Sequence, residues 1–246
     1  ISLPEEDLIR EAARLFGYQR KGPTVEIHIK HGIDQLVKRD RANRDADKAF
    51  FMAKYMKDQF PFLGIPKPNR ARLSGLFIKN AKKEKTIDWE LVARLWDLPE
   101  REFQYVALDY LQALKNYLNS QDIDRLQLLI TTKSWWDTVD LMASNIVGPL
   151  CLRNKELIDS HILGWAESEN IWLARSAILF QLKFKDKTDP LLLEHIILKN
   201  SNSKEFFINK AIGWVLREYS KTNREWVRDF VTQHPLSTLS VREASK

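Results

Sequence analysis

Apolar residues recur along almost the whole chain at spacings of three and four residues, whereas the alternation typical of a half-buried strand is scarce. This period predicts a succession of amphipathic helices. Because the connections between them are only a few residues long, neighbouring helices are expected to be antiparallel. The expected helices begin near Asp45, Asn69, Asp88, Pro99, Ser120, Ser134, Lys155, Glu169, Asp189, Ser203 and Asn223.

A second regularity has a period of 34 to 36 residues. Four alanines recur at this spacing, each expected in the second helix of a pair: Ala107, Ala143, Ala177 and Ala211. A small residue at a fixed helical position lets the neighbouring helix approach closely in each unit. The period is typical of helical pairs stacked in an α-solenoid, whose ligands usually bind the concave face. The tetratricopeptide repeat has a similar length, but its sequence pattern is missing, and the alternative is a non-repetitive helical domain.

The beginning of the chain differs in pattern from the rest. We expect residues 1–25 to form an N-terminal extension of unknown role, and residues 26–246 to form the repeat domain. Within the extension, Gly17 is expected to end a first helix.

Composition narrows the function. The net charge of +6 permits binding of a polyanion such as DNA but does not require it. No apolar run approaches a membrane span, no signal peptide is recognisable, and Cys151 has no partner for a disulfide, so a cytoplasmic protein is expected. Gly-rich phosphate loops are absent, and His28 and His31 have no metal-ligand spacing with other residues.

The segment 134–140 combines two tryptophans with two aspartates at the start of an expected helix. Ser134 is expected as the N-cap, with Asp137 completing a capping-box-like pair. Trp136 and Asp140 are four residues apart and therefore share one helical face. A capping box needs neither of these two residues, so their face is a candidate site. The alternative is that the tryptophans belong to the core and Asp140 is solvated.

Two later helices add cations. Arg175 interrupts an apolar helix, and Lys183 follows eight residues later on about the same side. Lys210, Trp214 and Arg217 are spaced i, i+4, i+7 and form one stripe of cation, aromatic ring and cation. Cations in such a stripe would bind phosphates while the ring contacts bases or sugars. Basic residues on helices are more commonly solvated, but their recurrence in register favours a DNA-binding face.

A face with one carboxylate, aromatic rings and cations suits a specific reaction. A purine alkylated at N3 or N7 is cationic and leaves readily from C1′ of its deoxyribose, building positive charge on the sugar. Asp140 would stabilise that charge and orient a water molecule, while the rings of Trp136 and Trp214 would present negative quadrupole density. Arg175 and Lys183 would hold neighbouring phosphates. The reaction requires no metal ion and no cofactor.

Several stretches of the chain carry the motifs of one known family. They are residues 53–57 (AKYMK), 62–65 (FLGI), 95–104 (LWDLPEREFQ), 132–137 (TKSWWD), 178–183 (ILFQLK) and 203–219. From about Ile33 to Ala244 the chain thus resembles the AlkD family of alkylpurine DNA glycosylases, which are built from HEAT-like repeats. The resemblance implies an all-α fold of HEAT-like helical pairs, stacked in a curved α-solenoid with a concave DNA-binding face.

The resemblance also places the site residues of the family on this chain. It assigns the catalytic aspartate to Asp140, the cleft tryptophans to Trp136 and Trp214, the phosphate-side arginine to Arg175, the lysine to Lys183 and the cleft tyrosine to Tyr55.

The activity implied by the resemblance is excision of 3-methyladenine and 7-methylguanine from duplex DNA, leaving an abasic site. The lesion would stay in the helix, unlike in enzymes that extrude the base. Monofunctional hydrolysis is expected because no lysine has the setting of a nucleophile.

The expected partner is double-stranded DNA containing alkylated purines, bound by a monomer that associates with the nucleoid. The alternative is a non-enzymatic HEAT-like scaffold that binds a DNA structure or a protein. A carboxylate facing DNA opposes phosphate binding, so Asp140 favours the enzyme.

Overall fold

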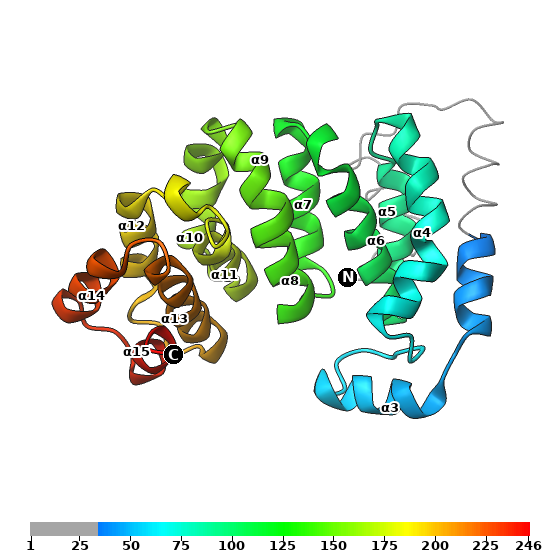
Figure 1. Ribbon diagram of the computed structural model, residues 1–246, viewed down its shortest axis with the longest axis horizontal. Coiled ribbons are helices and arrows are strands. Elements are labelled where there is room, and N and C mark those ends of the chain that lie inside the picture. The colour runs from blue at the N-terminus through cyan, green and yellow to red at the C-terminus, as the bar shows by residue number, and fades with distance from the viewer. Residues whose placement is uncertain (1–33) are drawn as a thin grey trace, which may run out of the picture. The chain divides into compact units, whose positions relative to one another are not determined.

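The computed structural model describes residues 34–246, and every regular element in this range is helical (Figure 1). The prediction of an all-α fold is therefore confirmed for these residues. The predicted extension, residues 1–25, and the first residues of the predicted repeat domain lie outside the described range. No helix among the described residues is both long and apolar enough to cross a membrane.

The chain divides into two compact units, the first extending to Tyr117 and the second comprising Leu118–Lys246. In the first unit, the buried carboxylate of Glu102 accepts hydrogen bonds from the backbone N–H groups of Leu63, Gly64 and Ile65, which fixes the loop before α4. Residues 34–42 of this unit are helical, and they are followed by α3 (Ala46–Tyr55), α4 (Lys67–Glu84), α5 (Trp89–Asp97) and α6 (Arg101–Leu114).

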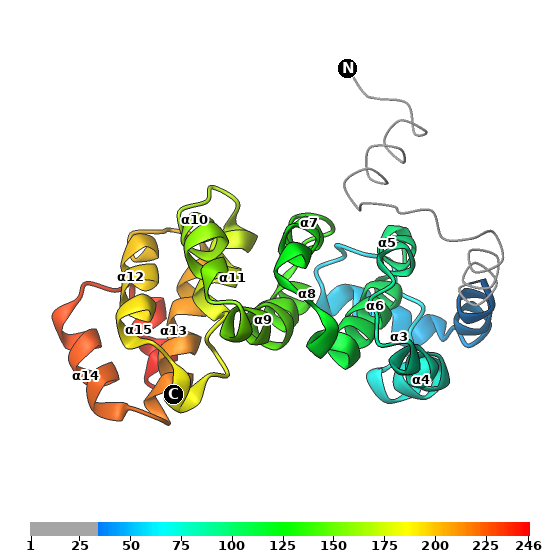
Figure 2. The same cartoon turned by 90° about the horizontal axis from the view of Figure 1, so that it is seen from above.

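The second unit contains the other predicted site residues. Helices α8, α11 and α13 lie side by side in it, with α11 in the middle (Figure 1). Helix α15 packs against α13, as both cartoon views show (Figure 2). Its α-helices are α7 (Ile123–Thr131), α8 (Trp136–Met142), α9 (Gly148–Arg153), α10 (Leu163–Ala166), α11 (Ile171–Leu179), α12 (Pro190–Asn200), α13 (Phe206–Ser220), α14 (Arg224–Gln233) and α15 (Thr238–Ala244).

The four alanines of the predicted repeat are all buried in helices. Ala107 lies in α6, Ala143 opens a π-helical turn after α8, Ala177 lies in α11 and Ala211 lies in α13. Their burial agrees with the expectation that small residues recur where helices approach closely. Cys151 is also buried, as expected for a core residue, and burial raises the pKa of its thiol to about 12.

The N-cap expected at Ser134 is wrong by one residue. Helix α8 begins at Trp136, and its N-cap is Trp135. The hydroxyl of Ser134 instead donates a hydrogen bond to the carbonyl oxygen of Ile130. That carbonyl belongs to the last turn of α7, where backbone acceptors lack partners within the helix. Ser134 therefore caps a carbonyl at the end of α7 and is not the N-cap of α8.

Candidate functional site

Helix α8 presents the two residues that the sequence singled out. Trp136 and Asp140 are one turn apart and partly exposed, whereas Thr138 and Val139 between them are fully buried. The buried pair fixes the rotation of the helix against the core. The face that carries Trp136 and Asp140 is therefore directed away from the buried side, as the spacing predicted.

Asp140 is held by Arg175 from the neighbouring helix α11. Nε of Arg175 lies 2.7 Å from Oδ1 of Asp140, and Nη2 lies 2.8 Å from Oδ2. The side chains are only 5% and 13% exposed, respectively. This two-pronged geometry is the strongest form of arginine–carboxylate pairing. Arg175, expected to bind a phosphate, is therefore paired with the predicted catalytic carboxylate.

The environment of Asp140 acts on its charge in two opposite ways. Burial disfavours the ionised carboxylate and raises its pKa above the usual value, while the hydrogen bonds and positive charge of Arg175 oppose that rise. Each carboxylate oxygen accepts one hydrogen bond from Arg175, and each has a second acceptor position. The carboxylate can therefore accept a further hydrogen bond, for example from water.

Arg175 also contacts the third helix of the site. Its Nη1 donates a hydrogen bond to the backbone carbonyl oxygen of Phe207, in the first turn of α13. One guanidinium group thus connects α8, α11 and α13. Its hydrogen bonds therefore link the helix that carries Asp140 to the helix that carries Trp214.

An aromatic cluster of Trp135, Trp172 and Phe207 lies beside the guanidinium group of Arg175. The three ring centroids are 5.0 to 5.6 Å apart, within the range of favourable aromatic packing. Each ring comes from near the N-terminal end of one of the three helices, so the cluster holds those ends together.

Lys183 lies in the turn after α11 and is exposed. Its ammonium group lies 2.5 Å from Oδ1 of Asn145, which belongs to the π-helical turn Ala143–Val147 after α8. The partner of this predicted DNA-binding cation is therefore a neutral amide.

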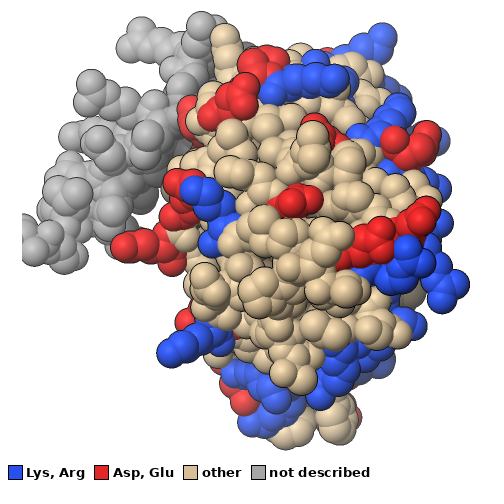
Figure 3. Space-filling model, turned by 90° about the vertical axis from the view of Figure 1, so that its left-hand side faces the viewer, with Lys and Arg blue, Asp and Glu red and all other residues tan. Residues whose placement is uncertain are grey.

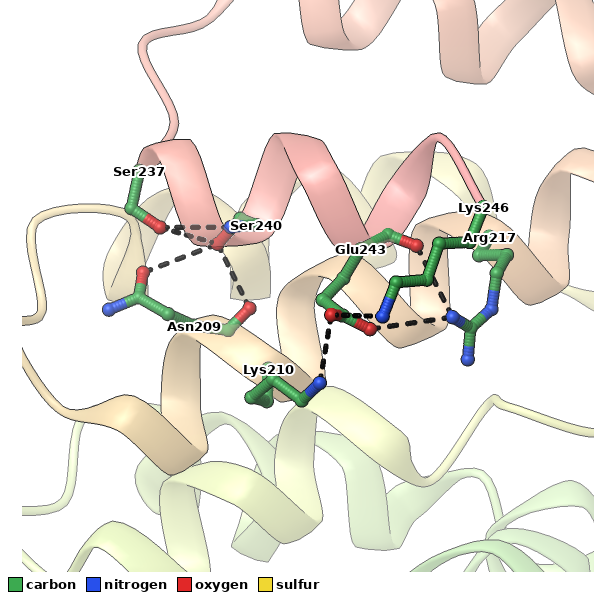
Figure 4. Close-up of polar contacts among 7 residues, drawn as sticks. All are labelled: Asn209, Lys210, Arg217, Ser237, Ser240, Glu243 and Lys246. Atoms are coloured by element: carbon green, nitrogen blue, oxygen red, sulfur yellow. Dashed lines mark hydrogen bonds and ion pairs between the residues drawn. The ribbon is translucent and has the colours of Figure 1, made fainter.

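The stripe on α13 has an acidic partner. The carboxylate of Glu243, buried on α15, lies 2.9 Å from Nζ of Lys210, 3.5 Å from Nη1 of Arg217 and 2.6 Å from Nζ of Lys246 (Figure 4). Hydrogen bonds from Lys210 and Lys246 lower the pKa of Glu243 to about 2. Lys210 and Arg217 therefore share a negative charge. Trp214, between them in sequence, is partly exposed.

The close contact of α13 with α15 depends on Gly213. A Cβ atom at this position would lie 2.4 Å from Cβ of Glu243 and 2.6 Å from the carbonyl oxygen of Ser240. The Ser240 hydroxyl in turn donates to the backbone carbonyl of Asn209 on α13 (Figure 4). Only glycine allows this approach, which brings Glu243 to the two cations.

The last predicted site residue belongs to the first unit. Tyr55 is the final residue of α3 and is 69% exposed, and Phe51, one turn earlier, is exposed to the same extent. Tyr55 belongs to a different compact unit from Asp140, so its role in the same site stays a prediction.

Charge is mixed on the end face of the second unit. Among the described residues that Figure 3 shows, Lys and Arg side chains lie close to Asp and Glu side chains, around a central area that is largely uncharged. Positive and negative side chains are thus interspersed on this face. Within residues 34–246, no group of three His, Cys, Asp or Glu side chains could hold a metal ion; His28 and His31 lie outside this range.

Two partners in the site were not predicted from the sequence. Glu243 and Asn145 are 26 and 38 residues from the cations that they contact, Arg217 and Lys183. Such pairs depend on which helices pack together, and a single sequence contains no direct signal for them. Gly213 and the Gly148-Pro149 dipeptide are the local signals that could have indicated close helix contacts and an irregular turn.

Comparisons with known proteins agree on one family. The family model for "DNA alkylation repair enzyme" matches residues 38–246. Among solved structures, the chain is similar to a "Predicted DNA alkylation repair enzyme from Enterococcus faecalis". That match has 34% sequence identity and a TM-score of 0.77, and it covers 83% of this chain and 96% of the other. No curated protein sequence matches the chain.

Proposed function

Because the chain belongs to the DNA alkylation repair enzyme family, we propose that it is a monofunctional DNA glycosylase acting on cationic alkylpurines. Its substrates would be 3-methyladenine and 7-methylguanine in duplex DNA, and its product an abasic site. Residues 26–246 would form the HEAT-like repeat domain, a curved α-solenoid whose concave face binds DNA as a monomer. Residues 1–25 would form an extension.

The observation that carries the proposal is the largely buried, two-pronged pair of Asp140 and Arg175, one helical turn from Trp136. A carboxylate that is largely withdrawn from water interacts more strongly with a developing positive charge than a solvated one does. Arg175 fixes its orientation and favours its ionised form. Asp140 is therefore suited to stabilise an oxocarbenium-like sugar.

The proposed reaction breaks the bond between C1′ and the purine nitrogen. The bonding electron pair leaves with the base, which converts the cationic purine into a neutral leaving group. A water molecule that donates a hydrogen bond to Asp140 adds its oxygen to C1′, and its proton passes through the carboxylate to solvent. Trp136 and Trp214 would contact the cationic nucleotide with their ring faces.

The DNA backbone would be bound by the cations of the second unit and by the first unit. Lys183, Lys210 and Arg217 would contact phosphates, with Glu243 limiting the free charge of the last two. Arg175 would act mainly by orienting Asp140 and not by binding a phosphate, because three of its nitrogens already donate hydrogen bonds within the protein. Tyr55 would contact the duplex from α3.

Release of free base from a methylated duplex tests the proposal. We expect the intact chain to liberate 3-methyladenine and 7-methylguanine and to leave abasic sites in equal number, with no strand cleavage. Unmodified purines should remain in the duplex. Binding of the methylated duplex without any base release would instead support the non-enzymatic scaffold.

A further inference from the structure

The cations predicted to bind DNA differ in the charge of their partners. Arg175 contacts the carboxylate of Asp140, and Lys210 and Arg217 contact a carboxylate on α15. Lys183 contacts the uncharged amide oxygen of Asn145. Lys183 is thus held in place by a partner that leaves its positive charge uncompensated.

The position of Asn145 follows from Pro149, four residues later in the same run of helix. Proline has no N–H group for the carbonyl of Asn145, and in a regular α-helix its ring would collide with that carbonyl. The π-helical turn Ala143–Val147 accommodates the proline, with the N–H of Gly148 donating to the carbonyl oxygen of Ala143. Single π turns of this kind often occur at functional sites.

Gly148 brings this turn to the segment that carries Lys183. A Cβ atom at position 148 would lie 2.2 Å from the carbonyl oxygen of Phe180, so only glycine fits. Phe180 is the C-cap of α11, and its ring packs against that of Phe184 with centroids 5.6 Å apart. Both rings are buried, which anchors the turn on either side of the exposed Lys183.

Hydrogen-bond donors remain at this contact. The Lys183 ammonium has three N–H groups, and one is directed to Asn145. Among the described residues 34–246, none accepts a hydrogen bond from the amide NH₂ of Asn145. The two side chains together offer an anionic oxygen several donors and one full positive charge.

We propose that Asn145 is a positioning residue that holds the Lys183 ammonium for a phosphate of the DNA backbone. The inference rests on the proposed function, because it takes duplex DNA as the ligand that Lys183 contacts. A neutral amide fixes the ammonium without neutralising it, and an aspartate at the same position would form an ion pair and remove the charge from the phosphate.

Asn145→Asp tests this directly, since the substitution changes charge but almost no volume. Affinity for an unmodified duplex is measured between 50 and 300 mM salt, which separates binding from excision. Loss of one phosphate contact should lower the slope of log K against log salt by about one. Lys183→Gln should lower the slope by the same amount, and the double variant should lower it no further.

Asn119→Asp is the matched control. Asn119 is an N-cap whose side chain accepts from the N–H of Gln121, and aspartate is an equally good cap. The substitution adds the same charge at a residue that makes no hydrogen bond with Lys183, and it should leave the slope unchanged. Asn145→Ala, which keeps the charge of Lys183 but removes its holder, should weaken binding several-fold at an unchanged slope.

Equal slopes for the intact chain and Asn145→Asp would overturn the inference, as would unchanged affinity in Asn145→Ala. Melting temperatures identify any variant that does not fold. If Asn145→Asp does not fold, the affinity of Asn145→Ala alone tests the inference. If the intact chain binds DNA but releases no base, the glycosylase proposal fails while the slopes still test Asn145.

Discussion

Arg175 and Asp140 are 35 residues apart in the sequence, yet two guanidinium nitrogens of Arg175 lie within 2.8 Å of the two carboxylate oxygens of Asp140. The same guanidinium reaches the backbone of Phe207, so a single side chain holds three helices and one carboxylate. The geometry of the proposed reaction and the packing of the second unit therefore depend on the same residue.

The pH dependence of base release should report the pKa of Asp140. Because burial raises this pKa above its ordinary value of 3.8, activity should fall on the acid side with a midpoint above 3.8. Arg175→Gln removes the positive charge that opposes the rise, so its midpoint should lie at higher pH. Single-turnover rates across the acid range measure both midpoints.

Arg228→Gln provides the control for this pH profile. Arg228 is exposed on α14 and pairs with Asp229, so its loss should leave the acid midpoint unchanged. An Arg175→Gln midpoint equal to or below that of the intact chain would contradict the proposed electrostatics of the pair.

Phe207→Ala should destabilise the second unit. The substitution removes the ring that contacts Trp135 and Trp172. Because this ring is partly exposed, we expect the free energy of unfolding to fall by roughly 2–3 kcal/mol, which is less than for a fully buried phenylalanine. Phe206→Ala is the control, since Phe206 is 57% exposed, and should cost about 0.5 kcal/mol or less. Urea denaturation measures both, and equal losses would show that the cluster has no special role.

Gly213→Ala should separate α15 from α13. Since the added Cβ would lie within 2.6 Å of Glu243 and Ser240, one helix must move, at a cost of about 1–3 kcal/mol. Gly164→Ala is the control on α10, where a Cβ atom would meet nothing within 4 Å apart from its chain neighbours and its own helix backbone, and the better helix propensity of alanine should stabilise by roughly 0.5–1 kcal/mol. Stabilisation by both substitutions would contradict the close helix contact.

Glu243 should make stability sensitive to acid. Its pKa is lowered from 4.5 to about 2 in the folded chain, so its contribution is complete above pH 4.5 and is lost as the pH falls towards 2. The free energy of unfolding of the intact chain should exceed that of Glu243→Gln at pH 7, and this difference should shrink over that range. A difference that stays constant down to pH 2 would contradict the pairing with Lys210 and Lys246.

The sequence predicted the features that depend on local spacing. The N-caps Asp88, Asp189 and Asn223 begin α5, α12 and α14 as expected, because a short acceptor side chain acts on the next turn. The shared face of Trp136 and Asp140 follows from helical geometry alone. These features need no knowledge of which helices pack together.

The charge partners could not be predicted in the same way. The stripe of Lys210 and Arg217 is present as expected, but its pairing with Glu243 requires the packing of α15 against Gly213. Arg175 was expected to bind a phosphate, and its pairing with Asp140 emerges only when α8 and α11 lie side by side. Long-range electrostatics thus modified the roles that residue type and periodicity had suggested.

The central proposal is that the carboxylate of Asp140 performs the chemistry, and one comparison tests it. Single-turnover release of 7-methylguanine is measured for the intact chain, Asp140→Asn and Asp137→Asn, a control on the same helix with the same change of charge. We expect Asp140→Asn to lower the rate by roughly 100-fold or more while its DNA affinity stays similar or increases, and Asp137→Asn to release base at close to the normal rate. Equal rates for the intact chain and a folded Asp140→Asn variant would contradict the assignment of Asp140.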